Sequence, residues 1–107
     1  MKKYKTKDGF VGVLVSGGYG AGWSTWNREE DREFFTMDHT LVAMQIADCG
    51  EDEVAAYISS TSGEEYSCTL GWENTEVIWL PEGTVFTILE YKGHESIEYA
   101  ISDYLIT

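Results

Sequence analysis

Basic residues are scarce in this sequence. Seven Lys and Arg stand against nineteen Asp and Glu among 107 residues, which gives a net charge of −12 at pH 7. From Glu33 through Tyr91 no Lys or Arg occurs, although that stretch, with Glu33 included, carries twelve acidic residues. Nucleic acids and anionic lipid surfaces are held mainly by Lys and Arg, so the sequence predicts neither direct nucleic-acid binding nor membrane binding. Two interpretations of the negative charge stay open. It favours fast association with a basic protein surface, or it serves only to keep the protein soluble.

Cysteine, histidine and long apolar runs are also scarce. The two cysteines, Cys49 and Cys68, are fewer than a disulfide scaffold of this size usually carries, so we expect a reducing, cytoplasmic setting. His39 and His94 have no metal-ligand spacing to either cysteine, and we expect no metal, no cofactor and no Cys–His nucleophile. No apolar run approaches the roughly 20 residues that span a bilayer, and the basic start lacks a signal-peptide core.

Short apolar runs predict the strands. Residues 9–16 are rich in β-branched side chains and almost continuously apolar, which is typical of a strand buried on both faces. In the C-terminal part we expect strands over 75–80 and 84–91. Lys92-Gly93 then connects the second of these to the alternating run 97–101 in a hairpin.

Three further segments predict helices. The charged run 28–35 is typical of a short helical turn capped by Asn27 or Thr25. A longer helix is expected from residue 36 or 38 to 48, with Asp38 near its positive end. Another begins at residue 51 and ends in the polar residues 59–63.

The predicted fold is a single domain over residues 1–107, because two hydrophobic cores would be cramped at this length. The single proline, Pro81, predicts a turn over residues 80–83 with Pro in its second position. The order of elements predicts an α+β fold. Its mainly antiparallel sheet contains the N-terminal strand and a C-terminal three-stranded meander, and two or three short helices pack on one face.

The segment from Gly17 to Asn27, GGYGAGWSTWN, is the most unusual part of the chain. It is not G-x-G-x-x-G, because Trp23 stands at the last glycine, and it has no Walker A lysine. It is not a G-x-S-x-G elbow either, since Leu14 lies two residues before Ser16. Two interpretations stay open. The aromatic side chains fill the core while the glycines allow close backbone approach, or the loop presents those side chains at a recognition surface.

Four segments of the chain resemble a group of small bacteriophage and prophage proteins. These are VLVSGGYGAGWSTWN, FFTMDHTLVAM, WLPEGTVFTILEY and YKGHESIE, which together extend over most of residues 12–98. No established catalytic motif comes with this group, so the resemblance implies no catalytic residue. It implies a phage setting, where small acidic proteins of this kind bind host proteins, as anti-CRISPR and other anti-defence inhibitors do.

The predicted function is therefore that of a phage-derived acidic inhibitor rather than an enzyme. We expect it to dock in the bacterial cytoplasm on a host protein with a basic surface, such as a nucleic-acid-handling CRISPR–Cas complex. A symmetric homodimer is left open. The predicted contact residues combine aromatic anchors with acids: Tyr19, Trp23, Trp26, Glu29, Glu30, Asp31, Glu51, Asp52 and Glu53. The alternative is a small-ligand protein that binds a nucleotide signal through the glycine loop, although few basic residues are present for its phosphates.

Overall fold

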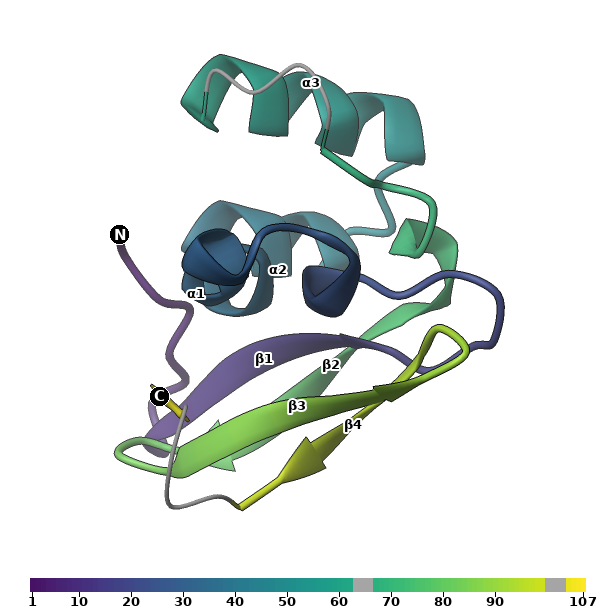
Figure 1. Cartoon of the computed structure of the whole chain (residues 1–107). Coiled ribbons are helices and arrows are strands. Elements are labelled where there is room, and N and C mark those ends of the chain that lie inside the picture. Colours follow the sequence, from purple (N-terminus) through teal and green to yellow (C-terminus); the bar gives the residue numbers. More distant parts are fainter. Residues whose placement is uncertain (63–66, 100–103) are drawn as a thin grey trace.

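The structure is a computed structural model, and it describes residues 1–62, 67–99 and 104–107. It has the predicted α+β fold, with antiparallel sheets and three α-helices. The helices lie on one side of the strands, and the α3 helix (Glu51–Ser62) is outermost (Figure 1). The helices α1 (Arg32–Met37) and α2 (His39–Ile46) lie between α3 and the sheets. None of the helices in these ranges is long and apolar enough to cross a membrane.

The first strand, β1 (Phe10–Ser16), lies where the apolar run predicts it. It pairs antiparallel with β2 (Thr75–Pro81) through a register that runs from Phe10 opposite Pro81 to Ser16 opposite Thr75. Leu14 packs into a core with the helices. Val11 and Val13 pack into a second core with Phe86 of the neighbouring sheet. This burial on both faces accounts for the continuous apolar character of β1.

The second sheet has the order β4–β3–β5, with β3 at Val85–Tyr91, β4 at His94–Glu98 and β5 at Leu105–Ile106. The predicted hairpin is confirmed. Its turn residues Lys92 and Gly93 both have positive φ, at 52° and 92°, as a two-residue hairpin turn of the I′ type requires. The predicted position Ile101 lies outside the described residues.

The prediction places the strand over 75–80 in this three-stranded sheet, and this is wrong. The strand pairs with β1 instead, and β5 takes its place beside β3. The turn after it also lies one residue later than predicted. Thr84 N donates to Pro81 O, and Gly83 has a φ of 89°. The chain therefore crosses from one sheet to the other at this turn.

The helices begin and end close to the predicted residues, but the first cap was wrong. The charged run forms a 3₁₀ turn, η2 (Glu29–Asp31), followed by α1, and neither has a side-chain cap. Asn27 instead spans the loop, donating to the carbonyls of Trp23 and Cys68. Asp38 does cap α2, where it accepts from Leu41 N at 3.2 Å. It also accepts from the Tyr57 hydroxyl at 2.6 Å, which ties α3 to α2, and burial together with this bond raises the pKa of Tyr57.

Candidate interaction surface

The glycine loop is organised around a buried carboxylate that comes from β4. Glu95 is almost fully buried, and its Oε1 accepts from Ser16 N at 2.9 Å. Its Oε2 accepts from Trp23 N, Thr25 N and the Thr25 hydroxyl, at 2.8, 3.0 and 2.6 Å. Hydrogen bonds from backbone N–H groups stabilise an ionised carboxylate away from water. These loop donors are already satisfied by the protein's own anion, so they are not free to bind a phosphate.

The loop also packs tightly on the turn of the β3–β4 hairpin. Gly20 N donates to Lys92 O at 2.7 Å, and a Cβ on Gly93 would overlap the backbone of Ala21. His94 Nδ1 lies 3.0 Å from Gly17 O, and the Tyr19 ring stacks on the His94 ring at 5.1 Å. The hairpin turn therefore sets the conformation of the loop.

Trp23 belongs to the hydrophobic core, and this corrects the prediction that it lies on the contact surface. Its side chain is fully buried, with an edge-on contact to Phe35 and a tilted contact to Trp72, both at 5.3 Å. Its indole Nε1 donates to Phe35 O at 2.7 Å, which satisfies the polar atom. No surface of Trp23 is left to contact a partner.

Trp26 is the exposed tryptophan of the loop, with 40% of its surface accessible. It lies in the short 3₁₀ turn η1 (Ser24–Trp26), and its Nε1 donates to Glu90 Oε2 at 2.9 Å. Gly93 N donates to the same carboxylate oxygen, also at 2.9 Å. The bond from the Trp26 indole, followed by that from Gly93, lowers the pKa of Glu90. The indole is thus exposed to solvent and held in one orientation.

Tyr19 and Trp26 lie on opposite faces of the β3–β4 hairpin. Glu90 and Tyr91 are neighbours in β3, so their side chains point to opposite faces. Trp26 bonds Glu90, whereas Tyr19 stacks on His94, the cross-strand partner of Tyr91. Sequence reasoning grouped the two rings in one surface, and the structure separates them.

The six predicted acids differ in how far the protein itself neutralises them. Arg28 Nε lies 3.3 Å from Glu30 Oε1 and 2.9 Å from Asp31 Oδ2, so these two carboxylates have an internal cation. Glu29 is exposed, as are Asp52 and Glu53 in the first turn of α3. Glu51 is partly buried and accepts from the Thr69 hydroxyl at 3.0 Å.

A hollow of about 270 Å³ beside the start of α3 adds two acids that sequence reasoning missed, Asp48 and Glu73. It is lined by Gln45, Asp48, Cys49, Gly50, Glu51, Trp72 and Glu73. The Trp72 indole, which donates to Cys49 O at 2.8 Å, brings the two segments together. Partial burial, with the nearby Glu53 and Asp48 carboxylates, raises the pKa of the Cys49 thiol. No sequence pattern indicates this hollow, because it forms only where Trp72 packs against the segment of Cys49.

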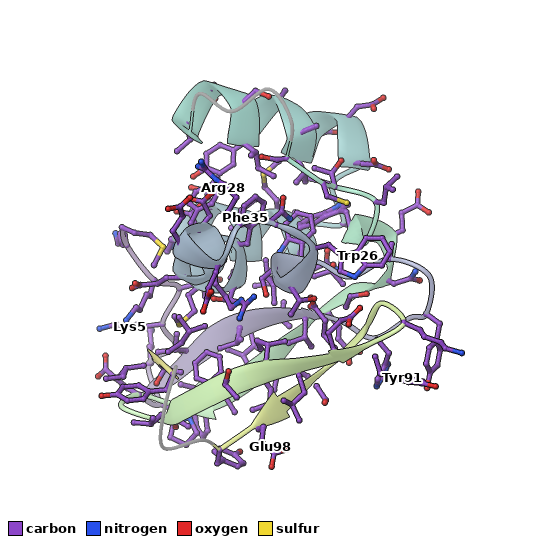
Figure 2. The ribbon with its side chains drawn as sticks, viewed as in Figure 1. Lys5, Trp26, Arg28, Phe35, Tyr91 and Glu98 are labelled. Atoms are coloured by element: carbon purple, nitrogen blue, oxygen red, sulfur yellow. The ribbon has the colours of Figure 1, made fainter. Side chains whose placement is uncertain are left out.

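Three of the seven basic residues gather at another part of the molecule. A hollow of about 610 Å³ is lined by Met1, Lys2, Lys3, Lys5 and His39. Two of its cations have internal partners, since Lys5 pairs with Glu82, and Lys3 lies 4.0 Å from Glu33. Lys5 and Trp26 lie on opposite sides of the molecule in Figure 2. The charge of the protein is therefore distributed unevenly.

Within residues 1–62, 67–99 and 104–107, no group of three or more His, Cys, Asp or Glu side chains is arranged to hold a metal ion. Both cysteines are free and partly buried. Comparison of the chain with family models, with curated proteins and with solved structures finds no match.

Proposed function

We propose that the protein is a phage-derived acidic inhibitor that acts by binding a host protein. The target has a basic surface and belongs to a nucleic-acid-handling defence complex of the CRISPR–Cas kind in the bacterial cytoplasm. In this proposal the protein competes for the basic surface on which nucleic acid would otherwise lie. It works by contact alone and transfers no chemical group.

The observation that carries the proposal is the exposed, oriented indole of Trp26, in a segment that hydrogen bonds join to the acidic hollow. Asn27, the next residue, bonds the backbone of Cys68 through both its Oδ1 and its Nδ2. Thr69 in turn bonds Glu51 at the start of α3. The described segments around Trp26 and the acidic hollow are thus joined by hydrogen bonds. Exposed tryptophans held in place are typical anchors of protein interfaces.

Acids and indole have separate roles in this proposal. Asp52 and Glu53 are exposed and steer a basic partner during approach, so they act mainly on the association rate. The acidic hollow between Asp48, Glu51 and Glu73 is suited to a Lys or Arg side chain of the partner. Trp26 is desolvated only once the complex has formed, so it acts mainly on the dissociation rate.

The experiment measures binding of the immobilised protein to purified CRISPR–Cas effector complexes, with and without their target DNA, in 50 and 300 mM salt. We expect binding that target DNA displaces and that weakens at the higher salt. Trp26→Ala should raise the dissociation rate about 10-fold or more, which is the loss typical of an interface anchor. Asp52→Asn with Glu53→Gln should slow association about 3- to 10-fold.

Two controls separate these effects from general changes. Asp8→Asn with Glu98→Gln removes the same number of charges at exposed positions outside the proposed contact. Ile46→Ala shortens an exposed apolar side chain on α2. Both should bind as the unchanged protein does. The proposed contact would be contradicted if binding did not depend on Trp26. It would also be contradicted if both charge variants weakened binding equally. No binding to any effector would contradict the target class.

A further inference from the structure

The face of the second sheet that points away from the helices carries an exposed row of apolar side chains. Along β3, Val85, Leu89 and Tyr91 share this face because side chains alternate in a strand. Leu89 is 49% exposed and Tyr91 is 64% exposed. Ile106, which pairs with Val85 from β5, is 47% exposed. Thr87 lies between Val85 and Leu89 on this face, and exposed apolar side chains gathered in this way mark interaction sites in soluble proteins.

Among the described strand and turn residues, this outer face carries two charges, the Glu98 carboxylate and the Lys92 ammonium, which lies 5.4 Å from the centroid of the Tyr91 ring. On β4 the face carries His94, Ser96 and Glu98. These residues are the cross-strand partners of Tyr91, Leu89 and Thr87, in that order. Glu98 is thus the single carboxylate that the described strand residues place on this face, in a chain with nineteen acids. Tyr91 and Glu98 both point away from the helices (Figure 2). Tyr19, stacked on His94 and 68% exposed, extends the face beyond the hairpin.

We propose that this face is the interface of a symmetric homodimer. Two copies of the chain, each with a net charge of −12, repel one another wherever carboxylates meet. They approach most readily through a surface with few carboxylates, and the outer face is such a surface, with Glu98 as the one carboxylate among its described strand residues. A basic partner has no electrostatic reason to choose it, whereas an identical apolar face complements it. A two-fold axis then places β3 of one copy against β3 of the other.

The size of the face indicates a dimer of moderate strength. The seven residues of β3 extend over about 23 Å, and the face is two strands or about 10 Å wide in plan, because β4 pairs with residues 87–91 and β5 with Val85 and Phe86. A standard stable interface buries about 800 Å² on each partner, and this face is smaller than that even with Tyr19 at its rim. We therefore expect a dissociation constant in the micromolar range. The acidic hollow beside α3 lies on other elements and stays accessible in each copy.

Sedimentation equilibrium of the purified protein from 5 to 500 μM, in 50 and 500 mM NaCl, tests the proposal. We expect a concentration-dependent dimer that forms several-fold more tightly at high salt, because screening reduces repulsion between the two anions. Leu89→Glu and Tyr91→Glu should each leave a monomer over the whole range. Ile46→Glu adds the same charge at an exposed apolar position on α2 and should still dimerise.

Circular dichroism checks that each variant is folded. Two substitutions are made on the face, Leu89→Glu and Tyr91→Glu, so that the test remains decisive when one variant does not fold. A monomer at 500 μM in both salts would overturn the proposal. So would dimers of both face variants, or a monomer of Ile46→Glu, because each places the contact elsewhere. Failure here is distinct from failure of the proposed host contact, which weakens with salt and depends on Trp26.

Discussion

At the scale of single residues, two carboxylates from the β3–β4 hairpin determine where the tryptophans of the loop lie. Glu95 accepts from Trp23 N, a residue 72 positions earlier in the chain, and Trp23 is buried. Glu90 accepts from the Trp26 indole over 64 positions and holds this ring at the surface. The two similar side chains thus have different roles, one in the core and one in the proposed contact.

Replacement of Glu95 by Gln should destabilise the fold by about 2–4 kcal/mol, the cost of leaving buried hydrogen-bonding groups mismatched. A carboxamide has one accepting oxygen, while its NH₂ group meets N–H donors of the loop whichever way it is turned. Urea denaturation measures the loss. Glu98→Gln, at an exposed position on the same strand, should change the free energy of unfolding by less than about 0.5 kcal/mol. Equal stability of the two variants would show that Glu95 does not organise the loop.

The bond between Trp26 and Glu90 should break on acidification, at a pH below the ordinary glutamate value of 4.5. The pKa of Glu90 is lowered in the folded protein, so its contribution to stability is present above the unfolded pKa. That contribution is lost as the pH falls through the folded pKa. The indole N–H proton resonance of Trp26, assigned by its absence in Trp26→Phe, should shift with that midpoint. Glu90→Gln should remove the titration, and a midpoint above 4.5 would contradict the lowered pKa.

At the scale of elements, the hairpin turn and the glycine loop form one unit although residues 28–91 separate them. The turn needs positive φ at Lys92 and Gly93, and the loop backbone lies against Gly93. The hairpin itself was predictable from Lys-Gly between alternating runs, because turn chemistry is local. Its contact with residues 17–22 was not, because no sequence pattern indicates which distant segment will pack on a turn.

Gly93→Ala tests this unit. The side chain would both strain a residue at a φ of 92° and overlap Ala21, so we expect a loss of at least about 2 kcal/mol in the free energy of unfolding. Gly83 is the matched control, since it has a φ of 89° and nothing within 4 Å of an added Cβ. Gly83→Ala should therefore cost only the backbone strain, about 1 kcal/mol. Similar losses in thermal or urea unfolding would indicate that the loop does not rest on the turn.

At the scale of the whole molecule, charge is divided between surfaces. The cations of residues 2–5 gather in one hollow, and acids beside α3 line another. Among its described strand and turn residues, the outer face of the second sheet carries one acid, Glu98, and one cation, Lys92. The two proposed contacts therefore respond to salt in opposite directions. Salt screens the attraction between the acidic surface and a basic host protein, and it equally screens the repulsion between two copies of the chain. One salt titration of each equilibrium distinguishes them.

The strands, the helices, the hairpin turn and the net charge were determined by the sequence itself, because apolar periodicity, turn residues and composition act locally or simply add. Tertiary structure alone decided that β2 pairs with β1, that Trp23 is buried while Trp26 is exposed, and that Asp48 and Glu73 share a hollow. Each of these outcomes depends on which distant segment supplies a partner. A carboxylate more than 60 residues away from a tryptophan leaves no trace in the sequence around it.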